Sequence, residues 1–113
     1  MAKTLYDKIY KAHIVKEEKN EPTIIYIDTH LIHEVTSPQA FTGLEKRKLK
    51  VRRPDLTFAT MDHSVPSINR DQFPWADKQA QEQVFVLSDN CKKNGICLYD
   101  LQSKHQGIVH VIG

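Results

Sequence analysis

The chain has 113 residues, of which 40% are hydrophobic and 27% charged, and its formal net charge is +2. This length allows one domain with a single modest core, and this composition excludes an intrinsically disordered chain. The near balance of charge gives no excess of positive charge that would indicate nucleic-acid binding. No run of residues approaches the roughly 18 apolar residues of a membrane span. Because Met1 to Thr4 lack an apolar signal-peptide core, we expect a cytoplasmic protein. From the charge balance and the absence of a long apolar run, we expect no nucleic-acid or membrane partner.

Two elements are predicted within the first 30 residues. Thr4 and Asp7 have the spacing of a capping box, and apolar residues recur at helical intervals after Thr4, which together predict a helix over residues 5–13. The β-branched run over residues 23–28 predicts a buried strand.

His30 and His33 follow this strand with the HxxH spacing that lets two histidines share a metal ion on a helix. No third ligand lies near them in the sequence. One alternative for the whole chain is a small histidine-rich metal-binding protein. It would use His30, His33, His63 and His110, although these four positions follow no known ligand spacing.

The next helix is expected to begin at Ser37 and Pro38. Serine caps a helix with its hydroxyl, and proline at the first helical position lacks an amide that would be unpaired there. A turn over residues 53–55 then leads into a second strand over residues 56–61.

Asp62 and His63 come directly after that second strand. The end of a strand holds side chains rigidly, and an adjacent carboxylate can orient an imidazole and raise its basicity. The pair is therefore a candidate unit for proton transfer, although an isolated Asp-His dipeptide is more often part of a surface loop.

The strongest helical pattern follows a loop over residues 64–72. Apolar residues keep a helical period from Pro74 to Cys91, which places the Cys91 thiol on the buried side of the helix. Asn94 and Gly95 predict a left-handed C-cap. In a cytosolic chain the two cysteines are expected to be free thiols.

Two more strands are predicted, over residues 96–99 and 108–112. His110 lies within the last one, where a core histidine with satisfied ring nitrogens is one interpretation. The alternation of helices and strands predicts an α/β fold with an at least partly parallel sheet. Because the last strand runs to Gly113 without a turn or a polar tail, we expect a chain truncated at its C-terminal end.

Several segments carry the pattern of a known family, in the family's order. They are Thr4–Lys8, Tyr26–Asp28, His33–Phe41, Phe58–His63, Tyr99–Leu101 and Gln106–Val111. On these segments the chain resembles the N-terminal part of the large subunits of 3-isopropylmalate dehydratase, in the aconitase superfamily. The resemblance implies that residues 1–113 form the N-terminal part of the first domain, a partial three-layer α/β/α aconitase-type domain, with the rest of the large subunit absent.

The resemblance implies a hydro-lyase of leucine biosynthesis, which interconverts 2-isopropylmalate and 3-isopropylmalate by removing and re-adding water. In this family a 4Fe-4S cluster with one open iron acts as a Lewis acid on the departing hydroxyl. Asp62 would orient His63, and His63 would help to protonate the leaving water. His110 would line the same site, and Gln39 would contact a carboxylate of the substrate.

The chain departs from the family pattern at the cluster. Three cysteines, including a CxxC pair, hold the cluster in the family, and Cys91 and Cys97 match none of them, so no metal ligand is expected within this fragment. The family takes its proton-abstracting serine from a small subunit, the expected partner in a heterodimer. We therefore expect this fragment alone to be inactive. A non-catalytic truncated remnant is a further alternative.

Overall fold

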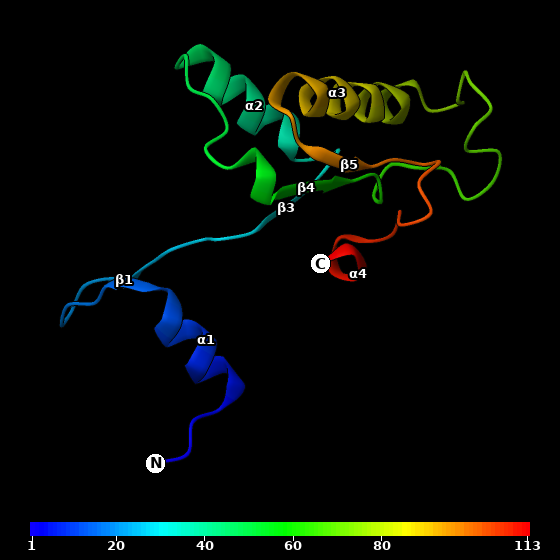
Figure 1. Cartoon of the computed structure of the whole chain (residues 1–113). Helices are drawn as coiled ribbons and strands as arrows, with labels where there is room; N and C mark the ends of the chain where they lie inside the picture. Colours follow the sequence, from blue (N-terminus) through cyan, green and yellow to red (C-terminus); the bar gives the residue numbers. More distant parts are fainter.

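The computed structural model describes all 113 residues, as an α/β body with an N-terminal arm that extends away from it (Figure 1). Its Cα radius of gyration of 17.4 Å exceeds the roughly 13 Å of a compact chain of this length, because the arm is extended. The elements in chain order are α1 (Leu5–His13), β1 (Ile14–Lys16), β2 (Ile24–Ile25), β3 (His30–His33), α2 (Ser37–Lys46), the 3-10 helix η1 (Pro54–Leu56), β4 (Thr57–Thr60), α3 (Lys78–Asn94), β5 (Cys97–Tyr99) and α4 (Val109–Ile112).

The arm consists of α1 and the antiparallel pair β1–β2. The predicted capping box is confirmed, because Thr4 Oγ1 accepts from the Asp7 amide at 3.1 Å and the Asp7 carboxylate accepts from the Thr4 amide at 3.0 Å. The predicted buried strand over residues 23–28 is wrong. Only Ile24 and Ile25 are in a strand, and they are 54% and 42% exposed. β2 pairs with β1 alone, so no third element covers its apolar side chains.

The body is built on a parallel sheet with the strand order β3-β4-β5, which confirms the predicted α/β class. Helices α2 and α3 pack against each other over one face of the sheet, and the short α4 lies on the other side, next to β3 and β4 (Figure 1). The core lies between the sheet and α3. It consists of Ile32, Ala59, Met61, Trp75, Val84, Leu87, Cys91 and Ile96.

Helix α3 begins at Lys78, four residues after Pro74, where the predicted helical pattern starts, and it follows the prediction from there to its C-terminal end. Its N-cap is Asp77, whose carboxylate accepts from the Ala80 amide at 3.0 Å. At its other end Gly95 has φ +66°, the predicted left-handed cap, and Cys91 is buried on the core side. Both cysteines are free thiols, as expected. None of the helices is both long and apolar enough to cross a membrane.

The predicted cap of α2 is wrong in detail. The N-cap residue is Thr36, which makes no side-chain cap, and Ser37 is already the first helical residue, with Pro38 after it. Thr36 has φ −101° and ψ −24°, close to helical values, so the chain enters the helix one residue earlier than expected. The Ser37 hydroxyl is buried and has no hydrogen-bond partner.

The predicted strand over residues 108–112 is also wrong, because these residues form the short helix α4. An apolar β-branched run of this length does not distinguish a strand from a helix by its pattern alone. Here the Thr60 hydroxyl donates to the Gly107 carbonyl, and Asp62 accepts from the Val109 amide. These groups are thus not available for pairing with another strand. His110 is exposed on α4, so it is not a core histidine.

Candidate active site at the carboxyl ends of the parallel strands

The candidate site lies where β3 and β4 end. The two strands are parallel, and their register pairs His33 with Thr60, so the residues that follow each strand emerge at the same edge of the sheet. Glu34 comes next after β3, and Asp62 and His63 follow β4 within three residues. In open α/β sheets this edge is where ligands bind.

Glu34 organises the turn after β4. Its side chain is fully buried, and its carboxylate accepts hydrogen bonds from three consecutive backbone amides, those of Asp62 (3.2 Å), His63 (2.7 Å) and Ser64 (2.5 Å). The Oε1 atom receives two of these bonds and Oε2 receives the third. A buried carboxylate needs such partners to offset its lost hydration.

Asp62 and His63 form a hydrogen-bonded pair. The Asp62 side chain is 4% exposed, its Oδ1 lies 2.5 Å from Nδ1 of His63, and its Oδ2 accepts from the Val109 amide at 2.8 Å. Because an aspartate carboxylate only accepts, Nδ1 carries the proton and Nε2 is left free to exchange one with a ligand. The His63 side chain is 50% exposed, so a ligand can reach Nε2.

His33 stacks on His63, with 3.8 Å between the ring centroids and 15° between the planes. The Val35 amide donates to Nδ1 of His33 at 3.2 Å, so Nδ1 acts here as an acceptor. The sequence suggested His33 only as a ligand in the alternative metal-binding interpretation, and it indicated no site role for Glu34. A strand prediction over residues 30–33 would have found them, because parallel strands bring their carboxyl ends together.

The segment before α4 is bound to the end of β4. Thr60 Oγ1 donates to the Gly107 carbonyl at 2.7 Å, and Gln106 Nε2 donates to the Met61 carbonyl at 2.7 Å. His110 is thereby held one residue from the amide that binds Asp62, and its own ring is exposed and makes no hydrogen bond.

Gln39 does not belong to the cluster of His33, Glu34, Asp62 and His63. It is exposed in the first turn of α2, and its side chain makes no hydrogen bond. Of the residues singled out in the sequence, the structure therefore brings Asp62 and His63 into contact and attaches the start of α4 to them. It leaves Gln39 outside.

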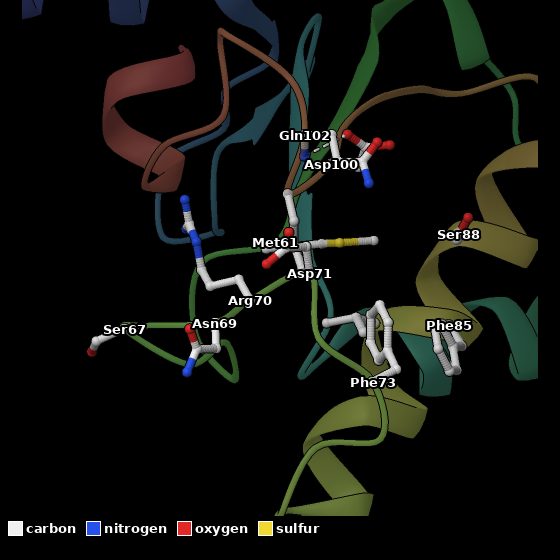
Figure 2. A pocket seen from close by; sticks show the side chains of 12 residues that line it. Met61, Ser67, Asn69, Arg70, Asp71, Phe73, Phe85, Ser88, Asp100 and Gln102 are labelled. Atoms are coloured by element: carbon white, nitrogen blue, oxygen red, sulfur yellow. Dashed lines mark hydrogen bonds between the residues drawn. The ribbon is translucent and has the colours of Figure 1, made fainter.

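Two cavities flank the loop over residues 64–72. The first, of about 710 Å³, is lined by His63, Trp75 and Asp77 among others. The second, of about 590 Å³, is shown in Figure 2, where Met61 lies above the rings of Phe73 and Phe85. Neither Asp62 nor His63 lines the second cavity. The first is therefore the one in which His63 could meet a substrate.

His33, Glu34, Asp62 and His63 also have the composition of a metal site, and one ligand atom from each lies within 4.8 Å of the others. However, both carboxylates and the Nδ1 atoms of both rings already make hydrogen bonds within the protein. The HxxH spacing does not create a shared metal site, because His30 and His33 lie on a strand, where residues three apart point to opposite faces.

The cysteines do not fit a 4Fe-4S cluster. The chain has two, whereas the family pattern requires three, and Cys97 lies at the start of β5, at the end of the sheet away from His63. Cys91 is buried on α3, and burial raises the pKa of its thiol to about 12, which opposes the thiolate form that iron requires. No catalytic step through a cluster can be derived from these residues.

Comparisons with known proteins agree with this architecture. The model of the aconitase family (aconitate hydratase) matches residues 7–113. The 3-isopropylmalate dehydratase large subunit of Oceanobacillus iheyensis is 54% identical over 110 residues, which cover 97% of this chain and 23% of that protein. The corresponding large subunit of Staphylococcus epidermidis is 51% identical over 113 residues, which cover 100% of this chain and 24% of that protein.

The chain thus spans about a quarter of the length of these curated relatives. No solved structure gives a significant match. The family match nevertheless covers nearly every residue, including both strand ends that build the site. The chain belongs to the aconitase family.

Proposed function

We propose that this chain is part of the large subunit of a 3-isopropylmalate dehydratase, a hydro-lyase that interconverts 2-isopropylmalate and 3-isopropylmalate in leucine biosynthesis. Residues 1–113 would form the N-terminal part of its first aconitase-type domain. The observation that carries this proposal is the buried Asp62 carboxylate on Nδ1 of His63, a half-exposed residue that lines the larger of the two cavities. The names of the two relatives support the substrate class.

In this proposal His63 transfers a proton to and from oxygen. When the C–O bond of the substrate breaks, Nε2–H of the protonated ring gives its proton to the departing hydroxyl, which leaves as water. In the reverse direction the neutral Nε2 takes a proton from water. Asp62 stabilises the imidazolium through Oδ1 and keeps Nε2 directed away from itself. The stacked His33 ring covers one face of His63 and restricts its rotation.

His110 and Gln39 have more distant roles in the proposal. His110 would line the site, supported by the bond between Asp62 and the neighbouring Val109 amide. Gln39 would contact a substrate carboxylate, and its support is the family motif alone. The family resemblance assigns proton abstraction from carbon to a serine of the small subunit. We therefore propose a cytoplasmic heterodimer, whose 4Fe-4S cluster is held by cysteines outside these 113 residues.

This proposal predicts that the 113-residue chain alone is inactive, because neither of its thiols fits the cluster. Purified chain, supplied with ferrous iron and sulfide, should not hydrate 2-isopropylmaleate above the rate of a chain-free control. The loss of the alkene absorbance measures the reaction. Turnover that scales with the concentration of chain would show that the inactivity prediction is wrong.

A chimera tests the function itself. Residues 1–113 would replace the matching quarter of the Staphylococcus epidermidis large subunit, co-expressed with its small subunit. The chimera should hydrate 2-isopropylmaleate, and His63→Asn should lower the rate by about 10²–10⁴-fold, as expected for loss of a general acid. His105→Asn is the matched control, because His105 is exposed and its ring makes no hydrogen bond. A folded, cluster-loaded chimera without activity would contradict the proposal and favour a non-catalytic remnant.

A further inference from the structure

We propose that Glu34 is a positioning residue, whose buried carboxylate fixes the backbone of residues 62–64 and thereby places His63 for proton transfer. The contact itself stands on the geometry, whereas its kinetic consequence rests on the function proposed above. Glu34 does not touch the reacting atoms in this scheme; it acts through the residues that it holds.

The first argument is the balance of charge around Glu34. The side chain is fully buried, and none of the ion pairs in the structure includes it. An unpaired buried carboxylate would be strongly destabilising. Here three backbone N–H groups that converge on one carboxylate replace the missing cation, in charge-assisted hydrogen bonds. This requirement accounts for all three bonds at once.

The second argument is the position of these bonds in the chain. The backbone ladder between β3 and β4 ends at the pair His33 and Thr60. Beyond this pair the amides of residues 62–64 have no strand to pair with, and buried amides need an acceptor. The Glu34 side chain supplies it and extends the connection between the two strand ends into the turn that carries the imidazole.

The third argument is that the position of the His63 ring depends on the position of its backbone. His63 is held at its backbone amide by Glu34, at Nδ1 by Asp62 at 2.5 Å, and at its ring face by His33. A shift of the backbone would therefore change the hydrogen bond and the stacking together. Proton transfer between heavy atoms depends steeply on such placement. Releasing the backbone should lower turnover more than substrate binding.

Glu34→Gln isolates the effect because it preserves the shape of the side chain. A glutamine has one acceptor oxygen and one NH₂ group. If the oxygen serves the His63 and Ser64 amides, the NH₂ group faces the Asp62 amide, and two donors oppose each other. Glu34→Asp keeps the charge but is one methylene shorter. Glu82→Gln is the matched control, because Glu82 is exposed on α3 and its side chain makes no hydrogen bond.

Hydrogen exchange on the 113-residue chain tests the contact, read by NMR at the amides of residues 62–64. Glu34→Gln should accelerate exchange at these amides at least 10-fold and leave the buried α3 amides unchanged, whereas Glu82→Gln should change neither. Unchanged exchange at residues 62–64 would overturn the proposal. If the α3 amides also lose protection in Glu34→Gln, the fold has been disturbed, and the Glu34→Asp variant is measured instead. Acceleration in Glu34→Asp that is confined to the amides of residues 62–64 supports the proposal. Wild-type exchange at these amides overturns it.

The chimera described above tests the kinetic part. Glu34→Gln should lower kcat at least 10-fold with KM changed less than twofold, and Glu34→Asp should restore part of kcat. An active chimera whose kcat is unchanged by Glu34→Gln would overturn the positioning role and leave the proposed function intact. A wild-type chimera without activity would instead contradict the proposed function, and the exchange experiment would then decide the Glu34 contact separately.

Discussion

The imidazole rings of His33 and His63 stack 3.8 Å apart, although the two residues are 30 positions apart in the sequence; His33 ends β3, and His63 follows β4. The parallel register of β3 and β4 makes this contact possible, because it pairs His33 with Thr60 and so brings the two strand ends together. The buried Glu34 completes the arrangement by holding the backbone under His63. The site is therefore a property of two strand ends and not of the Asp-His dipeptide alone.

His33→Ala should release the His63 ring without moving its backbone. The stacked ring of His33 shields the carbon-bound protons of His63, since aromatic ring currents act over this distance. In His33→Ala the His63 Cε1 proton should move downfield in the NMR spectrum, whereas His33→Phe should preserve the shielding. Identical His63 resonances in the wild type and in His33→Ala would show that the rings do not stack in solution.

Thr60→Val should destabilise the body by about 1–3 kcal/mol, the usual cost of leaving a buried acceptor without its donor. Thr60 is fully buried, its hydroxyl donates to the Gly107 carbonyl at 2.7 Å, and valine has nearly the same shape. Urea unfolding followed by circular dichroism measures the change in free energy of unfolding. Thr42→Val, at an exposed position of α2, is the control and should remain near the wild type. Equal effects of the two substitutions would argue against the Thr60 bond.

The stability of the N-terminal arm itself should depend on pH. His13 Nδ1 contacts the Ile9 carbonyl at 2.7 Å and its Nε2 contacts the Asp28 carboxylate at 2.8 Å. The hydrogen bond to the Ile9 carbonyl makes the larger contribution to raising the pKa of His13, and the bond to Asp28 adds to it. The same bond to His13 lowers the pKa of Asp28.

The signs of these two shifts define the window. The contribution of His13 is complete below its ordinary pKa of 6.5 and is lost as pH rises through the raised value. The contribution of Asp28 is complete above its ordinary pKa of 3.8 and is lost as pH falls through the lowered value. The arm should resist limited proteolysis best between these two ordinary values, and Asp28→Asn should lower the pKa of His13 in an NMR titration. An unchanged His13 titration in Asp28→Asn would contradict the contact.

The two thiols should differ in reactivity. Burial raises the pKa of Cys91 to about 12, so at pH 8 only about one in 10⁴ of these thiols is ionised. Cys97 is exposed at the start of β5. Iodoacetamide should add one group to the native chain at pH 8 and two groups in 8 M urea, as measured by intact mass. In Cys97→Ser the native chain should remain unmodified on the same timescale, and rapid labelling of this variant would show that Cys91 is accessible.

Local signals in the sequence predicted a large part of the fold. The capping box at Thr4, the C-cap at Gly95 and the buried face of α3 all depend on residues within a few positions of one another. Such signals operate through backbone hydrogen bonds and helical periodicity, which do not require knowledge of the rest of the chain. The Asp-His pair was likewise located in advance, because its position after a strand can be read from the sequence.

The tertiary structure decided which groups the local elements meet. Ile24, Ile25 and Ile27 are exposed because β2 pairs with β1 alone. Residues 109–112 form a helix because the Gly107 carbonyl and the Val109 amide are bound by Thr60 and Asp62. The Glu34 carboxylate accepts hydrogen bonds from amides that lie 28 to 30 positions further along the chain. The amino-acid sequence by itself thus determined the α/β class and the candidate proton-transfer pair. Only the packing of β3 against β4 determined how that pair is held, because a buried charge finds its partners through space and not along the chain.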